Sequence, residues 1–298
     1  MKSKSGLLAA GIIGLVLVIV IGGGIHLRNR SAAESDFLRG RAYQRGDGVP
    51  VDYAKAAELY KKAAAEGSGK AMHNLGYLYG QGWGVPRDPA ESVKWFRMGA
   101  EHGMDRSQDM LGYIYLKGQG VPRDPPAAAH WFEKAADQGS LDGQLQLGLL
   151  YYLGDTGVPQ DYSKAAKWLT LAAKQGSPAA ENNLGVMCED PSLKIGTQKQ
   201  AVDWYTQAAN AGYAKAQCNL GRIYFEGHLV SKDIVQGYMW LKLGADQNDV
   251  TANHLLADYI HGKGFTPEQI AQGNKLVEKF RSDHSAAPTL TAQNPPGH

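Results

Sequence analysis

Apolar residues recur along the chain with the spacing of amphipathic helices. In residues 71–82, AMHNLGYLYGQG, the apolar side chains fall at steps of 4, 3 and 1 and share one helical face: Ala71, Leu75, Leu78 and Tyr79. This segment ends in glycine, which can adopt the left-handed conformation that closes a helix. A second helix is predicted after each of five aspartates, whose carboxylates can cap the first backbone N–H groups: Asp52, Asp88, Asp124, Asp161 and Asp233.

A glycine-rich turn joins the two predicted helices and occurs four times. Its copies are GDGVPVD at 46–52, GWGVPRD at 82–88, GQGVPRD at 118–124 and TGVPQD at 156–161. Their valines recur at steps of 36, 36 and 37 residues. Pro89 and Pro125 follow directly, at the first helical position, where proline's missing N–H costs nothing. The glycines stop one helix and the aspartate starts the next, so each turn is predicted to be the hairpin of an antiparallel pair.

These turns belong to a repeat that extends over most of the chain. Helix A, the first of each pair, carries a ladder of glycines: Gly40, Gly76, Gly112, Gly148, Gly185 and Gly221. Helix B, the second, carries a ladder of large apolar residues: Leu59, Trp95, Trp131, Trp168, Trp204 and Trp240. A fixed period of this length is the signature of a solenoid of stacked units. We expect the glycine to let helix B approach closely and the buried tryptophan to fill the space beside it.

The sequence therefore predicts an all-α solenoid of six two-helix repeats at residues 35–251. The helix pairs are predicted to begin near these residues: Ser35, Lys70, Arg106, Asp142, Ala179 and Lys215. C-terminal helices at 252–283 are expected to cap the array, because Thr266 and Gln269 form a capping box before the last of them. Residues 284–298 have the composition of a disordered tail.

The repeated residues are similar to those of a known family. The pattern A-x-x-x-L-G-x-x-Y, then G-x-G-V, D-x-x-x-A-x-x-W and A-A-x-x-G, resembles the Sel1-like repeat (SLR) family of tetratricopeptide-like repeats, over about 35–283. The resemblance implies a right-handed superhelix and a non-enzymatic adaptor scaffold in membrane-associated or cell-envelope complexes. The unit that contains Cys188, GVMCEDPSLKIGTQKQ, lacks the glycine-rich turn and replaces the tyrosine, so we expect its loop to differ.

The N-terminus is predicted to anchor the chain in a membrane. Residues 5–25 form a run of 21 residues without a charge. As a helix, this run would span about 31 Å, the thickness of a bilayer's hydrocarbon core. The alternative is a cleaved secretory signal, whose best cleavage site, at 31–33, lies beyond Arg28 and Arg30. We therefore expect an uncleaved, single-pass transmembrane helix within 1–30. A slight excess of positive charge before the span favours a periplasmic or otherwise extracytoplasmic repeat domain.

Charge and motif content argue against several classes of function. Four of the 31 basic residues lie near the N-terminus: Lys2, Lys4, Arg28 and Arg30. The rest of the chain has 27 basic residues against 29 acidic ones, so the net charge of +2 arises at the N-terminus. That balance lacks the basic excess that nucleic acid requires, so no nucleic acid is expected as a partner. His254 and His261 have no acidic or cysteine partner at ligand spacing, and no nucleophile motif occurs. The sequence therefore predicts no metal, no cofactor and no catalytic site.

The positions between the packing residues of helix A vary from repeat to repeat and define the predicted partner site. Together with the turn residue Trp83, which we expect to be exposed, the predicted partner-binding residues are Asn74, Tyr77, Trp83, Tyr113, Gln146, Asn183, Asn219 and Arg222. Four of them are amides that hold the same place in four units. Such amides could pair with the backbone of an extended peptide. The alternative, which the residue types favour slightly, is that they satisfy the ends of neighbouring helices.

We therefore expect a scaffold that binds a protein or peptide partner and is held at a membrane. The alternative from another class is an envelope enzyme or small-ligand-binding protein that uses the superhelical groove. Catalysis requires several reactive side chains at one place. This sequence distributes its polar residues repeat by repeat, which favours the scaffold.

Overall fold

The computed structural model of the chain describes residues 32–262 and 264–284. The membrane anchor predicted at 1–30 lies outside these residues, as does the tail predicted from 284, apart from His284 itself. Among the described helices, none combines the length and the apolar character needed to cross a membrane. The described residues form helices and turns, with a single isolated β-bridge between Asp155 and Val158 and no strand.

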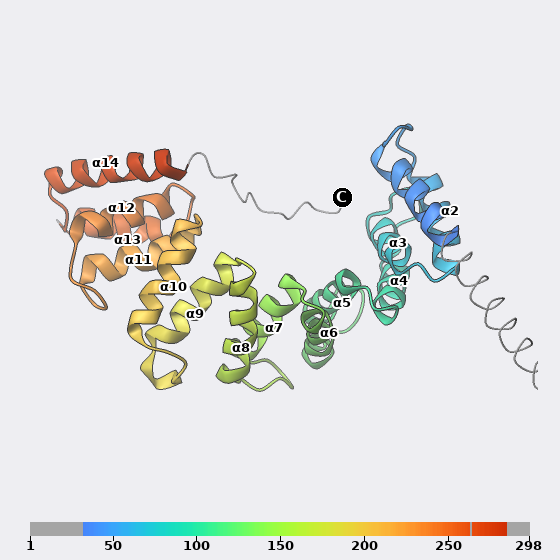
Figure 1. Cartoon of the computed structure of the whole chain (residues 1–298), viewed down its shortest axis with the longest axis horizontal. Helices are drawn as coiled ribbons and strands as arrows, with labels where there is room; N and C mark the ends of the chain where they lie inside the picture. The colour runs from blue at the N-terminus through green and yellow to red at the C-terminus, as the bar shows by residue number, and fades with distance from the viewer. Residues whose placement is uncertain (1–31, 263, 285–298) are drawn as a thin grey trace, which may run out of the picture. The chain divides into compact units, whose positions relative to one another are not determined.

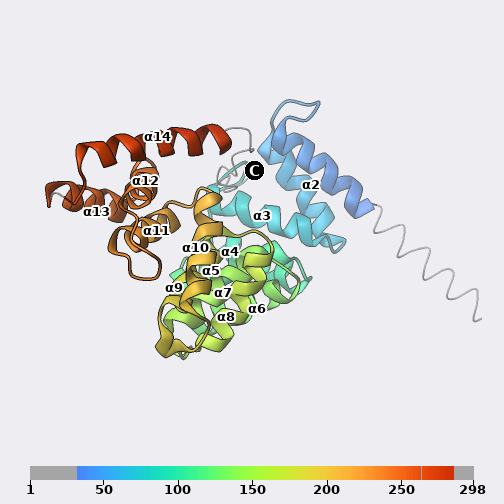
Figure 2. The same cartoon turned by 60° about the vertical axis from the view of Figure 1, so that its left-hand side comes forward.

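Helices A and B alternate along the chain (Figures 1 and 2). The A helices are residues 32–45, α3 (Gly69–Gln81), α5 (Asp105–Lys117), α7 (Leu141–Leu153), α9 (Pro178–Glu189), α11 (Ala214–Glu226) and α13 (Val250–His261). The B helices are α2 (Tyr53–Ala65), α4 (Pro89–Glu101), α6 (Pro125–Asp137), α8 (Tyr162–Lys174), α10 (Gln198–Asn210), α12 (Ile234–Ala245) and α14 (Pro267–His284). This order confirms the predicted all-α solenoid of helix pairs.

The chain forms two compact units, and the boundary between them falls inside α6, between Ala135 and Ala136. In the first unit, α3 packs against α2 and α4, and α4 also packs against α5. In the second unit, each helix from α7 to α12 packs against the next one along the chain. Three A helices, α3, α9 and α11, therefore contact both their own helix B and the helix B of the repeat before it, which is the arrangement of a solenoid.

The five predicted aspartate caps are confirmed. Each carboxylate accepts a hydrogen bond from the backbone N–H three residues later, at 2.9–3.0 Å. The aspartate's own N–H donates at 2.9 Å to the carbonyl of a tyrosine in the last turn of helix A: Tyr43, Tyr79, Tyr115, Tyr151 and Tyr224. In the second repeat, Gly82 and Gly84 have φ values of 76° and 68°, which favour glycine. The recurring glycine-rich segment is therefore the turn of a helical hairpin.

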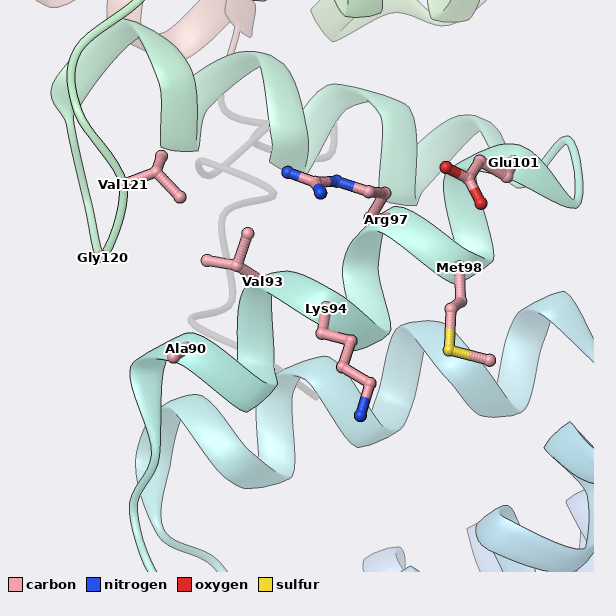
Figure 3. Close-up of a pocket in the computed structure, with 8 residues that line it drawn as sticks. All are labelled: Ala90, Val93, Lys94, Arg97, Met98, Glu101, Gly120 and Val121. Carbon is pink, nitrogen blue, oxygen red and sulfur yellow. The ribbon is translucent and has the colours of Figure 1, made fainter.

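The turns also connect successive repeats. Gly120 lies beside the start of α4, where an added Cβ would be 3.4 Å from the carbonyl oxygen of Pro89 (Figure 3). Gly84 approaches the start of α2 more closely still, since its Cβ would lie 2.2 Å from the carbonyl carbon of Tyr53. Each of these turns therefore rests on the N-terminal end of helix B in the preceding repeat.

The prediction that tryptophan fills the space beside the helix A glycine was wrong. A Cβ on Gly112 would lie 2.5 Å from the ring of Phe132, and one on Gly76 would lie 2.7 Å from the ring of Phe96. The side chain that faces the glycine is thus the one after the tryptophan, about 100° further round helix B. Trp131 is only half-buried, with the Lys134 ammonium 4.9 Å from its ring centre.

A ladder of buried glutamines joins consecutive repeats. Gln108, Gln144 and Gln217 lie four residues before the glycine of helix A, and each donates to the backbone carbonyl eight residues earlier. These three bonds are 3.1, 3.2 and 3.1 Å long, and their acceptors lie in the last turn of the preceding helix B. The carbonyls at a helix end lack intrahelical partners, so the glutamines satisfy them.

The fifth repeat has a different turn, as predicted. A short 3₁₀ helix, η1 (Pro191–Leu193), follows α9, and Thr197 forms a capping box with Gln200 at the start of α10. Cys188 is buried below this loop, and an added Cβ on Gly196 would lie 2.4 Å from its sulfur. A larger residue at position 196 would therefore require Cys188 or the loop to shift.

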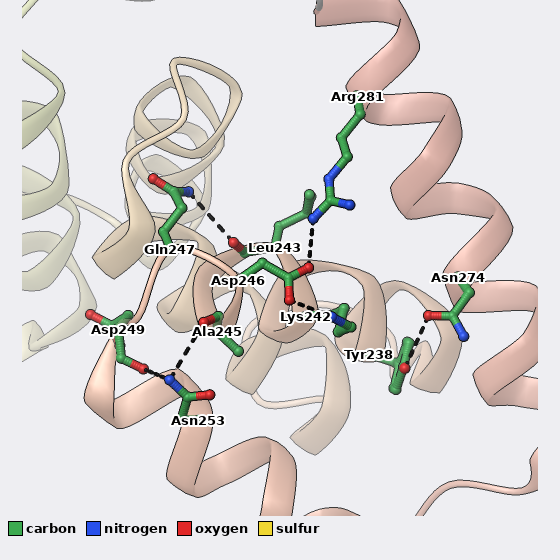
Figure 4. A network of polar contacts seen from close by, with 10 residues as sticks. All are labelled: Tyr238, Lys242, Leu243, Ala245, Asp246, Gln247, Asp249, Asn253, Asn274 and Arg281. Carbon is green, nitrogen blue, oxygen red and sulfur yellow. Dashed lines mark hydrogen bonds and ion pairs between the residues drawn. The ribbon is translucent and has the colours of Figure 1, made fainter. Parts of the chain in front are cut away.

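The last helix covers α12 (Figure 4). Its predicted capping box is present, since the backbone N–H of Thr266 donates to Gln269 and that of Gln269 donates to the Thr266 hydroxyl. Tyr238 of α12 donates its hydroxyl to Asn274 at 3.1 Å, and Arg281 pairs with Asp246 at 2.6 Å. Helix α14 thus covers the apolar surface of α12 that a further repeat would otherwise have to bury.

Candidate functional site

The packing residues of helix A leave one of its faces available. The leucine next to the glycine is at most 3% exposed in five repeats: Leu75, Leu111, Leu147, Leu184 and Leu220. Seven of the eight residues predicted to bind a partner lie between these packing positions and are half-buried. We call this surface, which holds Asn74, Tyr77, Tyr113, Gln146, Asn183, Asn219 and Arg222, the exposed A face. It is described within each unit separately.

Three of the four amides on the exposed A face are engaged inside the protein. Asn74 donates to Gln44 of the preceding repeat at 3.4 Å, and Asn219 donates to Asn182 of the preceding repeat at 3.0 Å. Asn183 donates to the carbonyl of Ala179 in its own helix at 2.7 Å. The side chain of Gln146 makes no hydrogen bond with the described residues. Two of these three hydrogen bonds therefore join neighbouring repeats, and both of them are accepted by side chains and not by the carbonyls of a helix end.

The two tyrosines present ring edges to the core. The Tyr77 ring meets Phe96 edge-on at a centroid distance of 5.2 Å, and Tyr113 meets Phe132 in the same way, also at 5.2 Å. Both contacts place an aromatic side chain of the exposed A face directly above the helix B side chain that packs on the glycine. A tyrosine of this kind combines a fixed apolar ring with a polar hydroxyl, which suits a contact surface.

Trp83 differs from the prediction. It is half-buried rather than exposed, because its ring packs against Tyr53 with a centroid distance of 5.4 Å. The turn that holds Trp83 rests on the start of α2, and this long-range contact leaves no signal in the turn sequence itself.

Arg222 lies in a cluster of polar side chains in the second unit. It donates to Glu189 at 2.7 Å and lies 3.5 Å from Glu226. Tyr205 donates its hydroxyl to the same Glu189 at 2.8 Å. Burial, followed by the charge of Glu189, raises the pKa of Tyr205, so this hydroxyl stays protonated. Tyr259 donates to Glu226 at 3.2 Å, and burial followed by that carboxylate raises its pKa to about 12. The cluster fixes Arg222 in place between two carboxylates.

A model of the Sel1 repeat matches this chain six times, at residues 33–68, 69–104, 105–140, 141–177, 178–213 and 214–249. The chain belongs to the Sel1 repeat family. The six matches place each Sel1 repeat as one helix A, its turn and its helix B, and they confirm the resemblance found in the sequence. Sel1 repeat proteins are generally non-enzymatic protein-interaction scaffolds.

Two solved structures are similar to this chain. A Sel1 repeat protein from Oxalobacter formigenes is 34% identical, with a TM-score of 0.61 over 72% of this chain and 88% of that one. A protective antigen present in uropathogenic Escherichia coli strains, which displays an SLR fold, is 32% identical, with a TM-score of 0.47. That match covers 84% of this chain and 61% of the antigen. The comparison with curated proteins gives no match.

Outside the exposed A face, one shallow pocket opens between the second and third Sel1 repeats (Figure 3). It has a volume of about 340 Å³, and its walls are α4 and the turn at Gly120 and Val121. Arg97 points along it and donates to the Tyr115 hydroxyl at 2.6 Å. Within the described residues no group of three or more His, Cys, Asp or Glu side chains could hold a metal ion. His254 and His261 are both exposed.

Proposed function

We propose that this Sel1 repeat protein is a scaffold that holds a protein or peptide partner against its exposed A face. One observation carries the proposal. On helix A the packing positions are buried and nearly constant, whereas the positions of the exposed A face are half-buried and do not hold the same residue in every repeat. A fold needs only the first set, so the variation in the second set is available for recognition of a partner.

The partner-binding residues of the proposal remain those of the exposed A face, together with Trp83. Because Asn74 and Asn219 already join repeats, they support the face more than they offer free amide groups. A partner would contact the polar and aromatic groups of four side chains: Gln146, Tyr77, Tyr113 and Arg222.

The proposed scaffold is tethered to a membrane by a single helix within 1–30, with its repeats in the periplasm or otherwise outside the cytoplasm. What supports this part is the uncharged run at 5–25, which has the length of a membrane span. The charged residues after it, Arg28 and Arg30, make a poor signal cleavage site.

The tether is tested on the full chain in its own cells. We expect the chain to stay with the membranes after an alkaline wash, and a version that lacks residues 1–30 to be released. A reporter active only outside the cytoplasm, fused after His298, should be active. A mature chain whose N-terminus is Glu34 would contradict the anchor, and activity from a cytoplasmic reporter alone would contradict the orientation.

A further inference from the structure

The first helix A, at residues 32–45, carries two arginines that have no acidic partner among the described residues. Arg41 and Arg45 are four residues apart, so they lie on one face of the helix. Neither forms an ion pair within the described part of the chain, whereas Arg39 of the same helix pairs with Asp36 at 3.3 Å. We call Arg41 and Arg45 the arginine pair.

The arginine pair continues the exposed A face into the first repeat. Arg41 holds the place that Tyr77 holds in the second repeat. The two helices lie side by side, since Asn74 of α3 donates to Gln44 of the first helix A. The first arginine of the pair is half-buried and the second is exposed. A partner that lies along the exposed A face of the first unit would therefore also contact the arginine pair.

The sixth repeat shows how the fold neutralises an arginine at this place. Arg222, which corresponds to Arg41, lies 2.7 Å from Glu189 of the preceding repeat and 3.5 Å from Glu226, four residues later. In the first repeat the residue four places after Arg41 is Arg45, so a like charge stands where Glu226 provides the opposite one. Like charges at this spacing destabilise a helix. The fold therefore does not require the arginine pair, and a negative charge from another molecule would stabilise it.

Arg41 also has a polar atom that is not satisfied. Its Nε–H is buried and has no hydrogen-bond partner among the described residues, although the side chain as a whole is only half-buried. Removing part of a guanidinium from water without a partner costs free energy. The helix dipole favours a cation in the last turn, which accounts for Arg45 but not for Arg41, one turn earlier. A carboxylate bound to the Arg41 guanidinium would offset the cost, because hydrogen bonds between ionised groups are the strong ones.

The acidic residues nearest in sequence do not neutralise the arginine pair. Glu34, seven residues before Arg41, pairs with Lys70 of α3 at 3.4 Å. Asp47, in the turn two residues after Arg45, forms no ion pair within the described part of the chain. The positive charge of the arginine pair is therefore available to an acidic ligand.

We propose that the arginine pair binds the carboxylates of an acidic segment of a partner protein. Leu38, which is 42% exposed and lies three residues before Arg41, would pack against an apolar residue of the same segment. The exposed leucine, together with Tyr77 on the neighbouring helix, favours a protein over an anionic membrane surface. The inference rests on the proposed function and names the chemistry of the partner.

The test uses the full chain in nanodiscs of phosphatidylcholine and a phage library of random 16-residue peptides as the probe. We expect the selected peptides to be rich in Asp and Glu and to bind more weakly as salt is added. Two variants copy residues that other repeats hold at these places: Arg41→Tyr copies Tyr77, and Arg45→Glu copies Glu226. Arg39→Gln is the matched control, because Arg39 is an exposed arginine of the same helix that already has a carboxylate partner.

Arg41→Tyr should weaken binding of the selected peptides about tenfold or more, the loss expected for one hydrogen bond between charged groups. Arg45→Glu should weaken it further, because it also repels the acidic peptide. Arg39→Gln should leave binding unchanged. Arg45→Glu should melt close to the wild-type temperature, since the new opposite-charge pair offsets the loss of a cation at the helix end. Lost binding in this variant would then not reflect lost folding.

Three results would overturn the inference. Selected peptides without an excess of acidic residues would remove the acidic partner. Unchanged binding in both variants, or equal weakening by Arg39→Gln, would remove the arginine pair as the binding site. Binding of anionic vesicles that depends on the arginine pair, with no acidic peptide selected, would identify a membrane surface as the occupant. If the selected peptides depend on Tyr113 or Gln146 instead, the proposed function stands and only this inference fails.

Discussion

Replacing Phe132 with alanine is expected to lower the free energy of unfolding by about 3–5 kcal/mol, the range for truncating a buried aromatic side chain. Phe132 is 0% exposed, and its ring fills the space directly opposite Gly112. The loss is a large part of the roughly 5–15 kcal/mol that stabilises a domain. The variant should therefore melt far below the wild-type chain when unfolding is followed by circular dichroism.

The neighbouring tryptophan supplies the comparison. Trp131→Ala removes a larger side chain, but that side chain is only half-buried, so the variant should lose less stability than Phe132→Ala. The two residues are adjacent on α6 and differ in the direction in which they point. A Trp131→Ala variant that melts as low as Phe132→Ala, or lower, would mean that the tryptophan and not the phenylalanine closes the helix pair.

Replacing Glu181 with glutamine is expected to stabilise the protein at neutral pH by about 1 kcal/mol, the net value of a typical hydrogen bond. Glu181 holds the place of the ladder glutamines in the fifth repeat and is only 9% exposed. Gln108, Gln144 and Gln217 each donate to a carbonyl eight residues earlier, which for position 181 is that of Ala173. An ionised carboxylate cannot donate, so the wild-type side chain leaves this bond unmade at neutral pH.

The gain should depend on pH in a definite direction. Burial raises the pKa of Glu181 above its ordinary value, so the folded protein holds this proton more tightly than the unfolded chain does. The wild-type protein is therefore most stable, as far as this group is concerned, below the ordinary glutamate pKa, and it loses that stability as pH rises through the raised pKa. The difference in melting temperature between Glu181→Gln and wild type should be largest at pH 7 and shrink toward about pH 4.

The reverse substitution is the matched control for the ladder. Gln144→Glu places a carboxylate opposite the carbonyl of Ala136, to which Gln144 donates at 3.2 Å, and it should destabilise the protein at neutral pH. If Glu181→Gln melts at or below the wild-type temperature at neutral pH, the carboxylate of Glu181 has a favourable partner and the ladder interpretation is wrong.

The sequence predicts well what is decided within one hairpin. The aspartate caps, the glycine turns and the first-turn prolines act over a few residues, and each of them is where the local pattern indicates. The features that the sequence does not predict depend on tertiary contacts. The positions of Phe132 and Trp131 both recur once in every repeat. Only the rotation of helix B about its own axis selects which of the two side chains faces Gly112.

The candidate site shows the same division. The periodic pattern separates the packing residues of helix A from the others, and the structure agrees for Leu75 and its counterparts. The sequence does not show which amides join repeats, because Asn74 and Gln108 form hydrogen bonds with residues of the preceding repeat.

The claim that the partner meets the exposed A face is tested most directly by site-specific photo-cross-linking in cells that make the full chain. A photoreactive residue replaces Tyr113 or Gln146 on helix A and, as controls, Glu133 or Lys167, which are exposed on helix B. The account predicts a discrete cross-linked protein from the two helix A positions and none from the two helix B positions. A discrete adduct from Glu133 or Lys167, with none from Tyr113 and Gln146, would contradict it.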